Sequence, residues 1–193
     1  MARTPAKARS RRDLILEVAE RLFTERGFDG TSIDAIGTEV GFTGPAIYYY
    51  FHTKHELLAA VLSRLSDAAY TQAEAAVDGV DDPAVALEAL VDCWVDHVFD
   101  HRGLIATFLS ERAHIPAEDL GPSTRSERNT IDLWARVLRR LRPELTPRVT
   151  RSTAFAAQWL AYSVSVSGQA DTPALRARHV AMARAVLLAP LNP

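Results

Sequence analysis

Helix start signals recur along this 193-residue chain, and they constrain its fold more than any other feature. In three places, a residue that favours the helix N-cap stands directly before proline. Proline is tolerated in the first turn of a helix because the amides there have no intrahelical partner to lose. Each pair therefore predicts the start of a helix. The three pairs are Asp82-Pro83, Thr146-Pro147 and Thr172-Pro173.

Other signals mark helices in the N-terminal part of the chain. Apolar residues recur every three to four positions in the first segment, and Gly27 after it suits a left-handed helix end. Thr31 is expected to cap a second helix that ends at Gly41, and Thr53 with Glu56 predicts a capping box before a long helix. No convincing period-2 alternation or internal repeat is visible, so we expect an all-α fold. The nine helices expected lie at about residues 9–26, 31–40, 43–50, 53–77, 83–101, 103–114, 123–142, 147–167 and 173–188.

Residues 31–51 place two short helices on either side of a glycine-containing turn. This spacing is typical of a helix-turn-helix, which places its second helix in the DNA major groove. The same geometry also occurs as plain helix packing. Charge adds a second signal: residues 1–12 carry five bases and no acid, whereas residues 57–100 carry one base and nine acids. A basic end on an acidic body favours DNA binding, although a solvated basic tail would explain the charges equally well.

The run from Thr31 to Leu58 closely resembles the DNA-binding signature of the TetR (tetracycline-repressor-like) family. Two positions depart from the family pattern: Gly37, where alanine is usual, and Gly44-Pro45-Ala46, where many members carry a polar base-reading side chain. The resemblance implies a DNA-binding domain over residues 1–52 and an effector-binding and dimerisation domain over residues 53–193. The features that carry it are Gly41, Ile47-Tyr48, Tyr50-Phe51 and Thr53-Lys54 before Glu56-Leu57-Leu58.

The resemblance also predicts which residues meet DNA. Those expected to face base edges are Gly44, Pro45, Ala46 and Tyr49, with Tyr48 facing bases, phosphates or both. Because the first three lack a hydrogen-bonding side chain, Tyr49 is expected to discriminate most between bases. Inward packing is the alternative for Tyr48 and Tyr49. The expected phosphate contacts are Thr31, Thr43, Tyr50 and Lys54. The basic arm that is expected to reach a minor groove or phosphates comprises Arg3, Lys7, Arg9, Arg11 and Arg12.

Aromatic and aliphatic residues at helical spacing fill the second half of the chain. Such patterns are more often core than pocket, but the resemblance implies an effector cavity among these helices. Arg112 or His114 is expected to orient a polar or anionic group of the effector. Neither a metal nor a cofactor is expected: His97 and His101 stand one helical turn apart without a third ligand. The expected ligand-binding residues are Trp94, Phe108, Arg112, His114 and Trp134.

The last two expected helices mix large and small apolar residues, which suits a four-helix seam between two copies of the chain. The resemblance implies a homodimer formed there, and an ordinary intramolecular core is the alternative. The residues expected at the dimer interface are Phe155, Trp159, Tyr162, Val180, Val186 and Leu187.

Together these features predict a transcriptional repressor, not an enzyme, that binds a palindromic double-stranded operator as a dimer and is released by a small, largely apolar effector. A single cysteine, Cys93, and the lack of an apolar run near about 18 residues indicate a cytoplasmic protein without a membrane partner. Two rival hypotheses are a helical small-molecule-binding protein that has lost DNA binding, and an all-α enzyme. The candidate catalytic groups of such an enzyme are His97, His101, Arg112 and His114.

Overall fold

A computed structural model of the chain describes residues 10–190, and this range is helical without a strand. The described residues form nine α-helices and one short 3-10 turn, which confirms the expected all-α class. No helix within this range is long and apolar enough to cross a membrane. The elements are α1 (Arg11–Arg26), α2 (Ile33–Val40), α3 (Gly44–Tyr48), α4 (Lys54–Val77), α5 (Pro83–Asp100), α6 (Arg102–Glu111), η1 (Arg112–His114), α7 (Ala117–Leu141), α8 (Pro147–Val166) and α9 (Pro173–Leu188).

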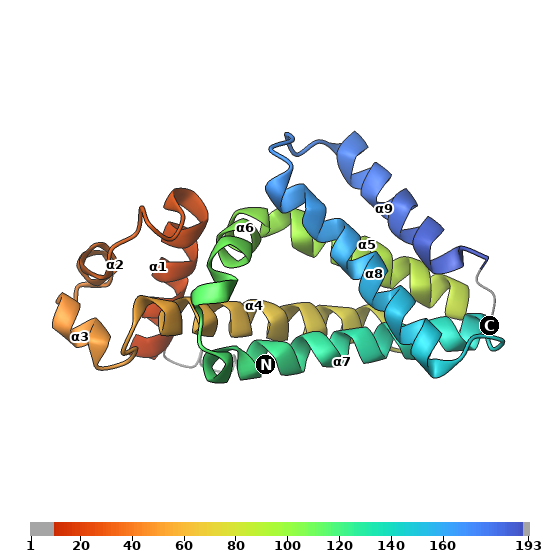
Figure 1. Cartoon of the computed structure of the whole chain (residues 1–193), viewed down its shortest axis with the longest axis horizontal. Helices are drawn as coiled ribbons and strands as arrows, with labels where there is room; N and C mark the ends of the chain where they lie inside the picture. Colours follow the sequence, from red (N-terminus) through yellow and green to blue (C-terminus); the bar gives the residue numbers. More distant parts are fainter. Residues whose placement is uncertain (1–9, 191–193) are drawn as a thin grey trace, which may run out of the picture.

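The helices form a small head and a larger body (Figure 1). Helices α1, α2 and α3 cluster at one end, and α4 runs from this head along the body beside α7. Helix α8 packs on α7, α5 and α6, and α9 packs on α5 and α8. A single connected set of buried apolar side chains runs from Ile15 in α1 to Leu187 in α9. Head and body are therefore mechanically linked through a common core.

The three helix starts predicted from proline pairs are confirmed. In each case, the side chain before the proline accepts a hydrogen bond from a backbone amide of the first turn. Asp82 accepts from the Ala84 amide at 2.8 Å, Thr146 from Val149 at 3.3 Å and Thr172 from Leu175 at 3.1 Å. These caps satisfy amides that the helix itself leaves unpaired.

Two predicted helix starts and one predicted capping box near the N-terminus need correction. Helix α1 begins at Arg11, after Ser10. The cap of α2 is Ser32 rather than Thr31, because the Ser32 hydroxyl accepts from the Ala35 amide at 3.0 Å. At α4, Thr53 accepts from the Glu56 amide at 2.9 Å, but the Glu56 carboxylate accepts from the His52 amide. Only half of the predicted capping box therefore forms.

Helix α7 starts earlier than the prolines predicted. A break over Pro116–Pro122 was expected, but α7 begins at Ala117 and contains Pro122. The Pro116 carbonyl accepts from the amides of Asp119 and Leu120 at 3.1 and 3.3 Å, which closes the first turn before Pro122 is reached. A proline this close to the N-terminus removes few helical hydrogen bonds. The consequence is a longer α7 that packs along α4.

Candidate nucleic-acid interface and internal cavity

The turn between α2 and α3 depends on the small size of Gly37. The Phe42 amide donates to the Gly37 carbonyl at 2.8 Å, and Gly41 ends α2 in the left-handed region with φ 73°. A Cβ on Gly37 would lie 2.8 Å from the Phe42 carbonyl oxygen and 3.3 Å from the Thr43 carbonyl carbon. Both atoms belong to backbone, which cannot rotate away as a side chain would. The structure thus explains the glycine that departs from the family pattern.

Gly44 does not face outward, which does not fit its predicted contact with base edges. The residue is buried at the start of α3, and any side chain there would collide with the carboxylate of Asp34 in α2. Gly44 instead allows α3 to approach α2 closely. Of its two neighbours, Pro45 is exposed and Ala46 is half-buried.

The three consecutive tyrosines take different positions at the end of α3. Tyr49 is 83% exposed and Tyr48 is 49% exposed, whereas Tyr50 packs partly against the core. The Tyr49 and Tyr50 rings meet edge to face, with their centroids 5.3 Å apart. Ile47 and Phe51 are the fully buried anchors of this segment. Inward packing therefore does not account for Tyr48 or Tyr49, and both are available to a partner.

The side chains of two predicted phosphate contacts form hydrogen bonds within the protein. Thr31 is fully buried, and its hydroxyl donates to the carbonyls of Leu22 and Gly27 at 3.1 and 2.8 Å, so a side-chain contact with phosphate is wrong. The Lys54 ammonium donates to the carbonyls of Phe28 and Thr31 at 2.8 and 3.0 Å. It also lies 3.9 Å from the centre of the Phe28 ring. Lys54 therefore ties α4 to the segment before α2, which does not fit the predicted phosphate role.

Other polar groups at this end remain open to solvent. Thr43 is exposed, and its hydroxyl does not cap α3. Two arginines of the first turn of α1 flank the head: Arg11 lies over the Phe42 ring at 5.6 Å and Arg12 over the Phe51 ring at 4.9 Å. The other predicted arm residues, Arg3, Lys7 and Arg9, lie outside the described residues.

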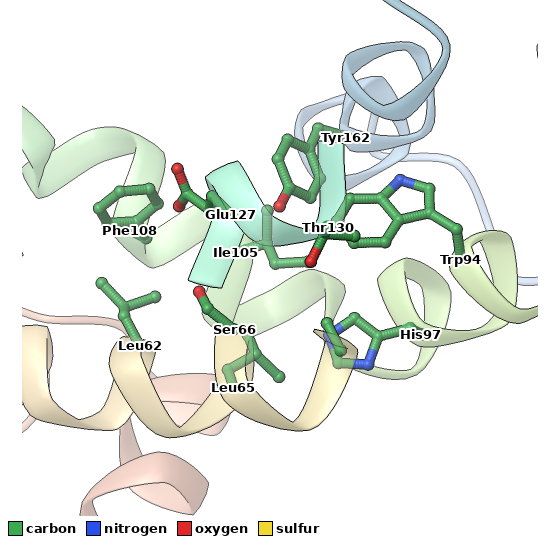
Figure 2. Close-up of a pocket in the computed structure, with 11 residues that line it drawn as sticks. Leu62, Leu65, Ser66, Trp94, His97, Ile105, Phe108, Glu127, Thr130 and Tyr162 are labelled. Carbon is green, nitrogen blue, oxygen red and sulfur yellow. The ribbon is translucent and has the colours of Figure 1, made fainter. Parts of the chain in front are cut away.

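A small cavity lies inside the body, between α4, α5, α6, α7 and α8 (Figure 2). Its free volume is about 30 Å³. Most of its wall is apolar, and six of the lining side chains carry a nitrogen or oxygen atom. The lining residues are Leu62, Leu65, Ser66, Ala69, Trp94, His97, Ile105, Phe108, Glu127, Thr130 and Tyr162.

The structure brings only two of the five predicted ligand-binding residues to the cavity wall, Trp94 and Phe108. Trp134 is fully buried behind the wall and meets the Trp94 ring edge to face at 6.4 Å. Arg112 is exposed on η1 with its guanidinium 5.3 Å from the Phe108 ring centre. His114 is exposed on η1 and lies 3.7 Å from the Glu111 carboxylate, away from the cavity. Trp134 and His114 are therefore not part of the cavity wall.

Sequence reasoning missed the polar groups of the cavity. Glu127 and Thr130 stand three positions apart in the sequence, a spacing that places both on one face of α7. This spacing is the signal from which their shared position on the cavity wall could have been predicted. Burial and the neighbouring His101 lower the pKa of His97 to about 4, so its ring is neutral at physiological pH. The His97 Nδ1 lies 3.2 Å from the Gln72 side-chain oxygen. Burial raises the pKa of the Glu127 carboxyl, and burial together with the Glu127 charge raises the pKa of Tyr162.

The residues predicted at the dimer interface divide into three groups. Phe155 and Trp159 are 46% and 41% exposed on α8, with ring centres 5.6 Å apart. Leu187 is fully buried in the core of its own chain, and Tyr162 lines the cavity, so these two predictions do not fit. Val180 and Val186 are half-buried against the core. Further exposed apolar side chains on α8 and α9 are Val166, Met182 and Leu188.

The acidic face of α5 is paired within the chain. Arg176 of α9 donates to the carboxylates of Asp96 and Asp100 at 3.0 and 2.7 Å, and also to Asp171. Arg184 lies 3.4 Å from the Asp92 carboxylate. Several of the acids in the acidic segment thus form ion pairs that hold α9 against α5.

Comparison with known families places the head among bacterial regulators. The model of the family described as "Bacterial regulatory proteins, tetR family" matches residues 15–61. The HTH-type transcriptional repressor NicS of Pseudomonas putida is 35% identical over 104 residues, which cover 53% of this chain and 49% of that protein. The HTH-type transcriptional repressor KstR2 of Mycobacterium tuberculosis is 24% identical over 118 residues, which cover 61% and 59%. The chain thus spans about half the length of the curated relatives it matches.

Solved structures share the whole fold. A regulatory protein in the tetR family from Rhodococcus RHA1 superposes with a TM-score of 0.75 at 19% identity, covering 93% of this chain and 98% of that one. AibR, solved in complex with isovaleryl coenzyme A and operator DNA, gives a TM-score of 0.73 at 20% identity, covering 94% and 100%. At these identities the likeness supports the all-α arrangement of head and body.

Proposed function

Because the chain belongs to the TetR family of bacterial regulatory proteins, we propose that it is a transcriptional repressor that binds a palindromic operator as a homodimer. In this proposal, residues 1–52 bind DNA, and residues 53–193 bind the effector and form the dimer. A small, largely apolar effector that enters the cavity releases the operator.

The observation that carries the proposal is the exposed edge of α3. Tyr48 and Tyr49 project from a helix whose other side is anchored by Ile47 and Phe51. A tyrosine hydroxyl can donate to or accept from base edges, and its ring can contact thymine methyl groups. Arg11 and Arg12 supply positive charge beside the head, and the exposed Thr43 hydroxyl does not cap α3. Such groups favour contact with phosphates on either side of a groove.

The effector part of the proposal follows from the size of the cavity. About 30 Å³ holds roughly two water molecules. Pockets for drug-sized ligands measure about 300–1,000 Å³. An effector must therefore move the surrounding helices apart, and one of them, α4, is separated from the end of α3 by five residues. If the effector binds the expanded form about 100-fold more tightly, it disfavours the DNA-binding form by about 2.7 kcal/mol.

Two further observations support the choice of partners. Exposed Phe155 and Trp159 give α8 an apolar surface that a second copy would cover. The AibR structure combines operator DNA with isovaleryl coenzyme A on a similar fold. The rival hypothesis of an enzyme gains nothing, because His101, Arg112 and His114 do not line the cavity and His97 alone among its four candidate groups does.

Gel shift and footprinting on the DNA upstream of the gene test the proposal. We expect protection of two half-sites related by two-fold symmetry, with centres about 34–36 Å apart or a multiple of this. Tyr49→Ala is expected to reduce discrimination against single-base changes by about 1–3 kcal/mol. Tyr49→Phe, which keeps the ring, separates the contribution of the hydroxyl. Protection of one asymmetric half-site, or equal losses on operator and scrambled DNA for Tyr49→Ala, would contradict the proposal.

A further inference from the structure

One carboxylate faces the otherwise largely apolar cavity without a partner. Glu127 extends from α7, and Figure 2 shows its side chain between the rings of Phe108 and Tyr162. Within residues 10–190, it forms no hydrogen bond and no ion pair. Glu127 is partly buried, and a carboxylate withdrawn from water without either contact is unfavourable unless a ligand supplies the missing donor.

The other polar groups of the wall carry no compensating charge. Ser66 and Thr130 contribute hydroxyls, His97 is neutral at physiological pH, and the Tyr162 phenol keeps its proton. The cation whose charge acts on Glu127 is Arg112, which is exposed on η1, lies over the Phe108 ring and does not line the cavity. Of the lining residues that the structure describes, Glu127 is therefore the one acidic side chain, and neither a lysine nor an arginine lines the cavity beside it.

We propose that the effector carries one positively charged hydrogen-bond donor on an otherwise apolar body, and that Glu127 binds this group. The inference rests on the proposed function, in which the effector occupies this cavity. A protonated amine would form a charge-assisted hydrogen bond with the carboxylate. The rings of Trp94, Phe108 and Tyr162 would cover its apolar part and offer faces that attract a cation. An anionic effector would meet the Glu127 charge in a region of low dielectric and is disfavoured. This proposal differs from the expectation that Arg112 or His114 orients a polar or anionic group of the effector.

A matched set of probes tests the proposal on the full-length protein. Para-hexylbenzylammonium, para-hexylbenzyl alcohol and para-hexylbenzoate share one apolar body and differ in charge. Binding is followed by the quenching of tryptophan emission, since Trp94 lines the cavity. We expect the ammonium probe to bind about tenfold or more tightly than the alcohol, and the benzoate to bind most weakly.

Variants of α7 identify the carboxylate responsible. Glu127→Gln is expected to remove the roughly tenfold preference for the ammonium probe while leaving the affinity for the alcohol unchanged. Glu127→Asp keeps the charge and should retain a preference, which distinguishes loss of charge from loss of folding. Glu118→Gln, at an exposed position of the same helix, is the matched control and should behave as the wild type.

Three outcomes overturn the proposal: no probe binds, the benzoate or the alcohol binds as tightly as the ammonium, or Glu127→Gln keeps the preference. A wild-type preference for the alcohol that changes to the ammonium in Arg112→Ala would also overturn it, since Arg112 would then neutralise Glu127. Operator release is scored separately by gel shift. If probes release DNA without a charge preference, the proposed function stands and the inference about Glu127 fails. If the ammonium probe binds through Glu127 but does not release DNA, the inference stands and the proposed effector mechanism fails.

Discussion

The α2–α3 turn and the internal cavity differ in how closely their atoms pack. In the turn, a Cβ on Gly37 would press on backbone atoms and a Cβ on Gly44 would press on the Asp34 carboxylate. In the cavity, about 30 Å³ is unfilled, and among the described residues the Glu127 carboxylate has no partner. Close packing holds the exposed tyrosines in one arrangement, while unfilled space leaves the surrounding helices fewer contacts to lose when they move. The head is built to present a fixed surface and the body to accept a change.

The start of α4 joins the two regions. Lys54 contacts Phe28 and Thr31 in the head, and His55 stacks on Phe28 with ring centres 4.5 Å apart. On its other side, the His55 Nε2 lies 3.5 Å from the carboxylate of Glu111 at the end of α6. The same α6 carries Phe108 into the cavity wall. A displacement of α6 by a ligand therefore reaches the segment before α2 through two contacts.

The largest expected effect concerns acid sensitivity, which should arise in the body. Burial lowers the pKa of His97 from 6.5 to about 4, so folding favours its neutral form. This stabilisation is fully present above pH 6.5 and is lost as the pH falls through about 4, amounting to about 3 kcal/mol in total. Chemical denaturation of wild type and His97→Gln between pH 7 and pH 4 should show a smaller decline for the variant. His114→Gln, on the exposed η1, is the control, and an equal decline in all three proteins would show that His97 does not set the acid response.

The next effect tests the junction. Lys54→Met removes the ammonium that two backbone carbonyls share, and we expect a loss of about 2 kcal/mol in the free energy of unfolding. The salt dependence of the remaining operator binding should be unchanged, because no phosphate contact is lost. Arg125→Met, at an exposed position of α7, controls for loss of a surface charge. A variant of normal stability whose salt slope falls by about one unit would instead identify Lys54 as a phosphate contact.

A pair of glycine substitutions compares the tight turn with an open position. Alanine is a better helix former than glycine by about 1 kcal/mol, so Gly121→Ala, which meets nothing within 4 Å, should stabilise the protein by about that amount. Gly37→Ala should instead destabilise the protein, because its Cβ would press on the Phe42 carbonyl. The cost of this overpacking is expected to exceed the gain in helix propensity by about 1 kcal/mol. Thermal unfolding and operator affinity of both variants check this. Equal stabilisation by the two substitutions would show that the α2–α3 turn can accommodate a Cβ and is not tightly packed.

The smallest expected effect concerns the stability of the protein without effector and its dependence on Glu127. Burial raises the pKa of Glu127, while Arg112 opposes the shift, so the folded state disfavours the charged carboxylate. Its unfavourable contribution is absent at low pH and grows as the pH rises through the raised pKa. Tyr162 on α8 and His97 on α5 also face this site and stay neutral at pH 7.5. The melting temperature of Glu127→Gln should therefore exceed that of wild type at pH 7.5 and match it near pH 4. A variant that is less stable at pH 7.5 would indicate that the carboxylate already has a partner.

Local signals predicted the helices well because their causes lie within a few residues. The caps at Asp82, Thr146 and Thr172 each bond an amide two or three positions away, so the sequence alone contains both partners. The errors involve contacts over longer distances. Thr31 bonds the Leu22 carbonyl, and Lys54 reaches back to Phe28. The resemblance to a family motif predicted that these two side chains contact phosphates. In the structure they form hydrogen bonds to backbone carbonyls of the same chain.

What the sequence by itself determined is the all-α fold, the position of the helix-turn-helix and the resemblance to a family of regulators, since periodicity, caps and motif spacing are local properties. Only the tertiary structure decided which side chains face a partner. Five helices from across the chain meet at the cavity, and their crossing brings Glu127 and Tyr162 to its wall while it hides Trp134 behind Trp94. Helical spacing defines the face a residue shares with its neighbours, but the orientation of that face depends on how helices distant in sequence pack together.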